Sequence, residues 1–316
     1  MSGHQKYLVV PLLSAIMLLS ATSSLHGQGG GRQPVLPQKT STPKKASTPK
    51  KVTPEKRNAP APSDSTCLAR SPKQSTGRER TLRLKGAVKI ELVEIPAGSF
   101  CMGSTNRQAD EKPVRLVSIK YPFYMAKYEI TQAQWQAVMG NNPSYFKDCG
   151  NCPVERVSWD DAQGFVYGLN QMNDGFSYHL PTEAEWEYAC RAGTGDYPGD
   201  YRQMAWYEEN SEKRSHPVGG KRPNDWGLFD MYGNVAEWCE DWYHESYNGA
   251  PTDGSAWLGG TDQQSRIIRG GSWYSFLSLL RSSYRHTNSR EVRHPFIGFR
   301  IVAKARARLP VGLPRL

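Results

Sequence analysis

The clearest pattern of hydrophobic positions along the chain is helical and follows Ser158. The stripe consists of Ala162, Phe165, Val166, Leu169 and Met172, which recur with the period of one helix face. Ser158 and Asp161 have the identities and spacing of a capping residue and its reciprocal partner. We therefore predict an amphipathic helix that begins after Ser158 and buries this stripe.

Two further helices are predicted from their ends. One follows Thr131 and stops at the Gly-Asn-Asn-Pro turn of residues 140–143. The other opens with a capping box formed by Thr182 and Glu185 and ends at Gly193. Beyond Gly193 the chain is rich in Gly, Trp, Tyr and Asn and has no long periodic run, which predicts short strands joined by long ordered loops.

Strand-forming residues begin near Val88 and continue to Ile95, and residues 100–103 are expected to form the next strand. The predicted domain therefore has few regular elements and much irregular backbone. Buried N–H and C=O groups of irregular backbone must still be satisfied. We expect bound cations, polar atoms of Trp and Tyr, and disulfides to contribute to this.

The N-terminus has the pattern of an export signal. Lys6 precedes an apolar run from Tyr7 to Leu19, and small residues follow from Ala21. The alternative is a membrane anchor, but the run is shorter than the ~20 residues that span a bilayer. We therefore expect residues 1–26 to be a cleaved signal peptide, and the protein to be exported (periplasmic or secreted) without a transmembrane anchor.

Positive charge is concentrated before the predicted domain. Residues 1–90 hold sixteen Lys and Arg against three Asp and Glu, a balance of +13, which leaves −3 for the rest of the +10 chain. A uniformly basic nucleic-acid-binding protein would not divide its charge in this way. Residues 27–87 are rich in Pro, Ser, Thr and Lys and nearly lack aromatics, which predicts a disordered basic linker.

The linker contains the repeat STPKK at residues 41–45 and 47–51. In a nuclear protein such repeats suggest contacts to DNA. Behind an export signal we expect no nucleic-acid partner, and a contact to anionic envelope surfaces is left open. The remaining boundaries are a domain over residues 88–308 and a short tail over 309–316.

The six cysteines are Cys67, Cys101, Cys149, Cys152, Cys190 and Cys239. Export implies an oxidising compartment, in which disulfides persist. Cys149 and Cys152 are followed by Pro153 and an extended segment, not by a helix, which favours a structural disulfide over a thioredoxin-like redox motif. The pairing of the other four stays open.

Seven segments, in order along the predicted domain, carry a resemblance to a known family. They are IPAGSFCMG (95–103), YEIT (128–131), PVERVSWDDA (153–162), LPTEAEWEYA (180–189), WGLFDMYGNVAEW (226–238), RGGSW (269–273) and GFR (298–300). Together they resemble the sulfatase-modifying-factor, or formylglycine-generating enzyme, family.

The resemblance implies a compact single α+β domain with little regular secondary structure, related to C-type lectins. It also implies a shallow groove that accepts an extended peptide. Within this scaffold we expect Arg269 and Arg300 to neutralise buried carboxylates such as Glu185 or Glu237, because a guanidinium binds a carboxylate through two hydrogen bonds.

The resemblance further implies structural calcium at the turn from Asp230 to Glu237. It places side-chain ligands at these two residues and carbonyl ligands at Gly233 and Val235. Carboxylates and carbonyls of one tight loop are ligands that Ca²⁺ takes. The alternative is that Glu237 pairs with an arginine and that the turn binds no metal.

The chain departs from the family at its reactive centre. Oxidising members resemble one another at Gly-Gly-Ser-x-x-Cys-x-x-x-x-Cys, whose two thiolates hold the Cu(I) that activates oxygen. Aligning this motif on residues 270–272 places Ser275 and Leu280 at the cysteine positions. Soft thiolates select Cu(I), whereas a serine hydroxyl is a poor ligand and leucine is none. We therefore expect no copper and assign no catalytic residue, with rescue by Cys190 or Cys239 as the alternative.

Two classes of function follow from the resemblance. In the first, the groove binds a peptide, a glycan or a partner protein, or supports chemistry without copper. In the second, the protein is an oxidase that converts a sulfatase cysteine to formylglycine. The candidate groove residues are Ser272, Trp273, Arg281, Tyr284 and Arg285.

Overall fold

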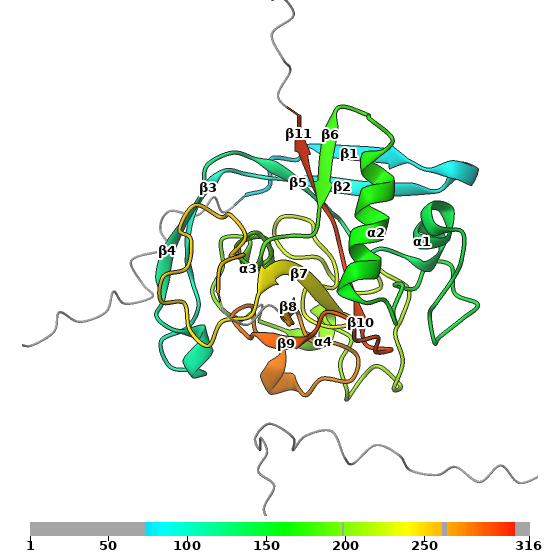
Figure 1. Ribbon diagram of the computed structural model, residues 1–316. Helices are drawn as coiled ribbons and strands as arrows, with labels where there is room; N and C mark the ends of the chain where they lie inside the picture. Colours follow the sequence, from blue (N-terminus) through cyan, green and yellow to red (C-terminus); the bar gives the residue numbers. More distant parts are fainter. Residues whose placement is uncertain (1–73, 198, 261–263, 307–316) are drawn as a thin grey trace, which may run out of the picture. The chain divides into compact units, whose positions relative to one another are not determined.

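The three predicted helices are present in the computed structural model, which describes residues 74–197, 199–260 and 264–306 (Figure 1). They are α1 (Gln132–Met139), α2 (Trp159–Asn170) and α3 (Glu183–Arg191). Each opens with a reciprocal capping box, centred on Thr131, Ser158 and Thr182 respectively. A short fourth helix, α4 (Tyr201–Met204), has no counterpart in the prediction.

The stripe of α2 is buried as predicted, except at its end. Met172 lies beyond the last residue of the helix and is exposed, so its expected place in the core is wrong. Asn170 explains the early stop, because its side chain accepts a hydrogen bond from Tyr178 N at 2.9 Å and donates to Tyr178 O at 2.8 Å. These bonds tie the end of α2 to the following strand.

The strands are short and form three sheets. Their bounds are β1 (Glu79–Arg83), β2 (Lys89–Ile95), β3 (Gly98–Met102), β4 (Arg115–Ile119), β5 (Phe123–Ala126), β6 (Phe176–His179), β7 (Ala236–Trp242), β8 (Ser265–Arg269), β9 (His286–Ser289), β10 (Ile297–Gly298) and β11 (Val302–Ala305). The sheet orders are β1-β2-β5-β11-β6, β10-β7-β8-β9 and β3-β4. β11 lies between β5 and β6 and runs antiparallel to both, so the last strand of the domain joins the same sheet as the first two strands, β1 and β2 (Figure 1).

Order begins earlier than predicted. β1 lies within the segment expected to be a linker and pairs with β2 along its whole length, from Glu79↔Val93 to Arg83↔Lys89. The expected boundary at residue 88 is therefore wrong. The sequence signal is weak because β1 is an edge strand of mostly charged residues in which only Leu82 is buried. The expected signal peptide and most of the linker lie outside the described residues.

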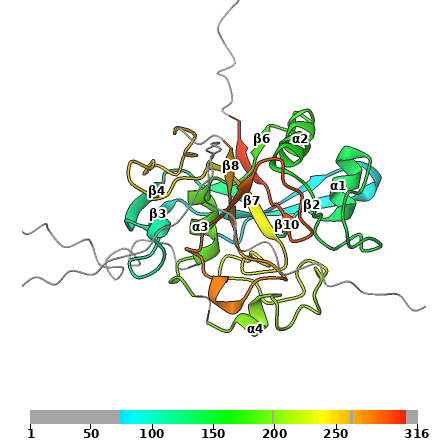
Figure 2. The ribbon, with the colours of Figure 1, turned by 60° about the horizontal axis from the view of Figure 1, so that its bottom comes forward.

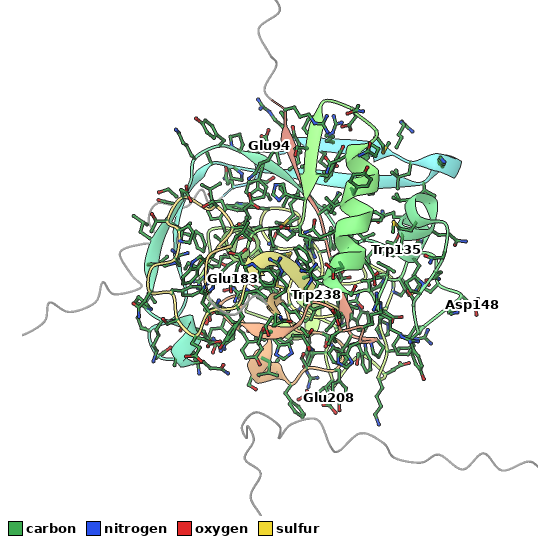
Figure 3. All side chains as sticks on the ribbon, in the orientation of Figure 1. Glu94, Trp135, Asp148, Glu183, Glu208 and Trp238 are labelled. Atoms are coloured by element: carbon green, nitrogen blue, oxygen red, sulfur yellow. A yellow bond between two sulfur atoms is a disulfide. The ribbon has the colours of Figure 1, made fainter. Side chains whose placement is uncertain are left out.

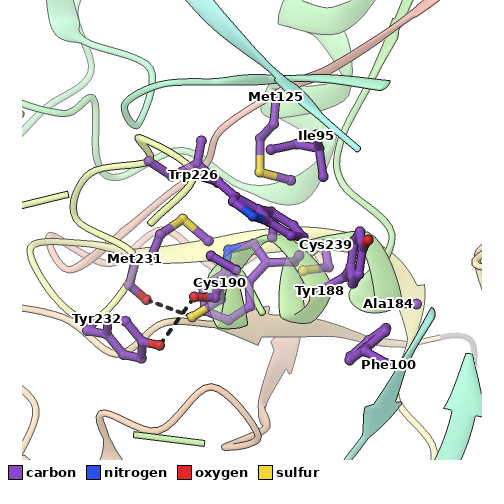
Figure 4. Packing of buried hydrophobic residues seen from close by; sticks show 14 of the residues in the cluster. Ile95, Phe100, Met125, Ala184, Tyr188, Cys190, Trp226, Met231, Tyr232 and Cys239 are labelled. Atoms are coloured by element: carbon purple, nitrogen blue, oxygen red, sulfur yellow. Dashed lines mark hydrogen bonds between the residues drawn. The ribbon is translucent and has the colours of Figure 1, made fainter. Parts of the chain in front are cut away.

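The core forms two clusters of buried side chains. One packs α1 and α2 on the five-stranded sheet, and the other surrounds α3 (Figure 2). Figure 4 shows the second cluster, in which Trp226, Tyr188 and Met231 pack beside Cys190 and Cys239. Within the described ranges, no helix is both long and apolar enough to cross a membrane.

Helices α1 and α2 approach closely because two glycines of α2 face α1. A Cβ on Gly168 would lie 2.8 Å from Val138 Cγ1, whereas a Cβ on Gly164 would lie 3.5 Å from Met139 Cε. The first contact is a clash with a stiff, branched side chain, and the second is ordinary packing. The two positions therefore offer a matched pair of substitutions.

We predict that Gly168→Ala destabilises the domain by about 1–3 kcal/mol, because the new methyl group overpacks the interface. Gly164→Ala should be neutral or stabilising by up to about 1 kcal/mol, because alanine favours the helix. Urea denaturation measures both values. Equal stabilities for the two variants would contradict the packing described here, and Val138→Ala should rescue Gly168→Ala.

Candidate functional site

The two positions that correspond to the family's cysteines flank one glycine. A Cβ added to Gly271 would lie 2.6 Å from Leu280 Cδ2 and 3.4 Å from Ser275 Oγ. The two side chains therefore converge, as the alignment on residues 270–272 requires. Neither carries a sulfur atom, so the pair offers no soft ligand to Cu(I).

Ser275 is held by its own loop. Its Oγ accepts a hydrogen bond from Ser272 N at 3.0 Å and lies 3.3 Å from Ser272 Oγ, while its carbonyl oxygen accepts from Glu208 N at 3.1 Å. Ser272 is buried, and Leu280 is completely buried in the core. Both family positions thus contribute to the local structure of this turn.

The free thiols among the described residues are Cys190 and Cys239, and both lie inside the core (Figure 4). Cys190 Sγ donates to Met231 O at 3.8 Å. Burial raises the pKa of Cys190 to about 12 and the pKa of Cys239 well above its ordinary value. Because Cu(I) binds thiolates, these protonated thiols are poor substitutes for the missing pair.

Cys149 and Cys152 form the predicted disulfide. The bridged loop supports the start of α1, because Gln132 N donates to Cys152 O at 2.9 Å and Ala133 N donates to the carbonyl oxygen of Gly150 at 3.0 Å. Cys101 is also disulfide-bonded. Cys190 and Cys239 do not pair with each other, and Cys67 lies outside the described residues.

Arg281 and Arg285 do not face a ligand. Arg281 binds Glu111 through two hydrogen bonds of 2.8 and 2.6 Å, and Arg285 binds Glu183 through two of 2.7 and 3.0 Å. Both guanidinium groups are buried. The expectation that they offer cationic contacts in a groove is therefore wrong, because each charge is already neutralised. Tyr284 lies half-buried, with its ring 5.7 Å from the Arg281 guanidinium carbon.

Two buried carboxylates of α3 organise this region, those of Glu183, labelled in Figure 3, and Glu187. Glu187 binds both Arg191 and Arg269, and Arg269 also lies 3.6 Å from Glu183. Arg269 therefore neutralises carboxylates as expected, but not that of Glu185. Its Nη1 and Nη2 also donate to the carbonyl oxygens of residues 282, 283 and 284, which follow the turn at Ser275 and Leu280, whereas its Nε is buried without a partner.

A row of aromatic side chains runs beside Ser275, and sequence analysis recognised only Trp273 among them. In order of contact they are Tyr145, Phe146, Trp273, Tyr274, Phe296 and His294, with neighbouring ring centroids between 4.8 and 5.9 Å apart. We call these six residues the aromatic row. Trp273 is buried, with its Nε1 donating to Pro295 O, whereas Tyr145 and Tyr274 are 63% and 44% exposed. Because the row assembles from three distant loops, no local spacing reveals it.

At the predicted calcium turn, Glu237 is paired with an arginine. Arg300 Nε and Nη2 donate to its two oxygens at 2.7 Å each, and Trp186 Nε1 donates at 2.8 Å. This is the arrangement expected for Arg300. The carboxylate is thus neutralised by protein groups.

The same turn nevertheless carries excess negative charge. Asp230 Oδ2 accepts from Gly219 N at 2.7 Å, but its Oδ1 is buried without a partner. Burial raises the pKa of Asp230 to about 6 and also raises the pKa of the neighbouring Glu129, which the sequence did not single out. Three buried carboxylates, those of Glu129, Asp230 and Glu237, thus face the buried guanidinium of Arg300, and the half-buried Lys221 adds a second positive charge near Asp230.

This charge balance and the unpartnered oxygen suit a hard cation. In the part of the chain that the structure describes, no three His, Cys, Asp or Glu side chains are grouped to hold a metal. A cation at this turn would therefore need backbone carbonyls as well, as the predicted ligands Gly233 and Val235 would supply.

We predict that Glu111→Gln destabilises the domain by about 3 kcal/mol, because it leaves the buried Arg281 without its main counter-charge. The matched control is Asp160→Asn, which faces the exposed Arg290 and should cost at most about 1 kcal/mol. Guanidinium chloride unfolding gives both values. A loss for Glu111→Gln no larger than the control would show that the buried pair is dispensable.

The chain is similar to known proteins in both sequence and structure. The family model of the sulfatase-modifying factor enzyme 1-like domain matches residues 84–305. The chain is 30% identical to chaperone protein LppX of Paenibacillus barcinonensis, over 68% of this chain and 90% of that protein. It is 27% identical to the formylglycine-generating enzyme of Mus musculus, over 67% and 75%.

Among solved structures, PvdO from Pseudomonas aeruginosa matches with a TM-score of 0.64 and 29% identity, over 71% of this chain and 98% of that one. The fold is therefore that of formylglycine-generating enzymes, a compact α+β, C-type-lectin-like domain with little regular secondary structure. The chain belongs to the family of sulfatase-modifying factor enzyme 1-like domains.

Proposed function

We propose that this chain is a noncatalytic member of its family, which binds a polypeptide without oxidising it. The observation that carries the proposal is the pairing of Ser275 and Leu280 at the two family cysteine positions. One side chain is a hydroxyl that is already hydrogen-bonded, and the other is a buried alkyl group. With both soft ligands absent, copper has no thiolate pair there and oxygen activation loses its basis.

A polypeptide partner is supported by the aromatic row and by one relative. Aromatic side chains are enriched where proteins bind one another, because they combine a large contact area with few rotatable bonds. The relative LppX is named a chaperone protein, and chaperones act on other polypeptides. This supports a peptide or protein ligand over a glycan.

The second candidate is the oxidase, which the likeness to the mouse formylglycine-generating enzyme favours. For this activity the chain would need thiolates from elsewhere. The free thiols of the described residues, those of Cys190 and Cys239, are buried, and burial raises the pKa of each. We therefore rank the oxidase below the binding function.

We further propose that the protein is exported and binds structural calcium. Export is supported by the signal pattern at residues 1–26 and by the Cys149–Cys152 disulfide, which an oxidising compartment would maintain. Calcium is supported by the unpartnered Asp230 Oδ1 and by the excess of carboxylates around Arg300. Asp230 would bind the ion through its side chain, with Glu237 shared between the ion and Arg300.

We predict no aldehyde when the protein is incubated with a Cys-x-Pro-x-Arg peptide, copper, reductant and oxygen. Mass spectrometry of the peptide is the measurement, and a reaction without protein sets the background. Aldehyde formed over several turnovers would overturn the proposed function. Ser275→Cys/Leu280→Cys should gain Cu(I) binding in competition with a colorimetric chelator, whereas Ser275→Ala/Leu280→Val should not.

We predict that a calcium chelator lowers the melting temperature. A cation present at 100 times its Kd, if it binds only the folded state, contributes about 2.7 kcal/mol. Asp230→Asn should remove most of this response, and the exposed control Asp253→Asn should retain it. A wild-type melting temperature that ignores both chelator and added calcium would rule out the calcium proposal.

A further inference from the structure

The turn that replaces the family's reactive centre presents apolar side chains to solvent. Tyr274, Phe276 and Leu277 are 44%, 59% and 42% exposed, within four consecutive positions. The other exposed large hydrophobic side chains of the described residues are spread over positions 116–258. We call residues 274–279 the apolar tip. Apolar side chains concentrated in this way mark an interaction site more often than scattered ones do.

The apolar tip is held rigidly at both ends. On one side, Ser275 is bound to Ser272 N and Glu208 N. On the other side, Leu280 is completely buried. The tip itself includes the 3-10 turn η5 (Leu277–Leu279), closed by a hydrogen bond of 2.9 Å from Leu279 N to Phe276 O.

The two family cysteine positions, Ser275 and Leu280, lie close to the two ends of the tip. At the positions that would hold copper in an oxidase, this chain has residues that fix the conformation of a turn. A rigid turn loses little conformational entropy when it binds, so its exposed side chains are pre-organised for a partner.

The apolar tip is continuous with the aromatic row. Tyr274 belongs to both, and its ring stacks on Phe296 with centroids 5.9 Å apart. Phe296 stacks in turn on His294 at 4.8 Å. The combined surface extends over several side chains, which is more than a small ligand needs. It suits a polypeptide segment that places several apolar side chains in succession.

The charge beside this surface is mixed and does not form a basic face. Glu208, whose backbone contacts the base of the tip, is exposed (Figure 3). The Arg214 guanidinium carbon lies 5.8 Å from the ring of Phe146 in the aromatic row. The chain from residue 91 onward carries a net charge of −3. An anionic lipid surface attracts clusters of basic side chains, so a surface with this charge favours a polypeptide over a membrane.

From this geometry we infer that the apolar tip is a docking site for exposed apolar segments of non-native polypeptides. This inference rests on the proposed binding function and deepens it. Recognition is by Phe276 and Leu277, which insert between the partner's apolar side chains, and by Tyr274, which joins them to the aromatic row. No motif or cysteine in the partner is required.

The test uses the full exported chain and a permanently unfolded probe, reduced and carboxymethylated α-lactalbumin with a fluorescent label. Fluorescence anisotropy measures its Kd for the wild type, for Phe276→Ser/Leu277→Ser and for the control Tyr167→Ser. Tyr167 is exposed on α2. The tip variant should bind at least ten times more weakly than the wild type, and the control should bind equally well. Because all three positions are exposed, the melting temperatures should stay the same.

Three results would overturn the inference: no binding of the probe by the wild type, unchanged binding by the tip variant, or equal loss in the control. Co-sedimentation with vesicles of phosphatidylcholine and phosphatidylglycerol (3:1) adds a further check. Vesicle binding that the tip variant loses would assign the tip to lipid. Unchanged probe binding by the tip variant leaves the noncatalytic assignment standing, whereas aldehyde formation would overturn that assignment and not the tip.

Discussion

The structure depends on buried arginines that each bind a carboxylate and one or more backbone carbonyls. Arg269 joins Glu187 to the carbonyls of residues 282–284, and Arg191 joins the same glutamate to the carbonyl oxygen of residue 103. Arg285 joins Glu183 to the carbonyls of Asp110 and His244. A domain with little regular structure must satisfy its buried carbonyls individually, and a guanidinium has enough donors to do so while its charge is neutralised.

The arrangement of these arginines explains why loss of the cysteines is compatible with the fold. The turn at residues 275–280 is flanked by Arg269, which binds the carbonyls after it, and by Arg281, which binds Glu111. Among the described residues, no hydrogen bond of Arg269 or Arg281 goes to the side chain of Ser275 or Leu280. The two arginines therefore hold the turn through its neighbours, and a change at either family cysteine position removes none of their hydrogen bonds, although Ser275 and Leu280 contribute contacts of their own.

Sequence alone predicted the elements whose signals are local. Local end signals placed all three long helices: Thr131 and the stop at residues 140–143 for α1, and a Ser or Thr with its partner three residues on for α2 and α3. The Cys149–Cys152 disulfide likewise lies within one short loop. β1 was missed because an edge strand with one buried residue has no hydrophobic pattern. The fold itself came from the resemblance, because the irregular segment after Gly193 has no periodicity to interpret.

The candidate site was only partly predictable, because many of its contacts join residues that are far apart in sequence. An arginine near a groove motif can bind a ligand or neutralise a buried carboxylate. Arg281 and Arg285 do the second, because they bind Glu111 and Glu183. These glutamates lie about a hundred or more residues away in sequence. The aromatic row likewise joins Tyr145 to Phe296 through loops that meet only in three dimensions.

The substitution of the cysteines and the exposure of the apolar tip have a common physical basis. A copper site needs accessible soft ligand atoms, whereas here Leu280 is buried in the core and the hydroxyl of the half-buried Ser275 is bonded to Ser272 N. Phe276 and Leu277, which lie between these two positions, are exposed. Without metal ligands at its two family cysteine positions, this turn can still bind a partner through the exposed side chains of Phe276 and Leu277.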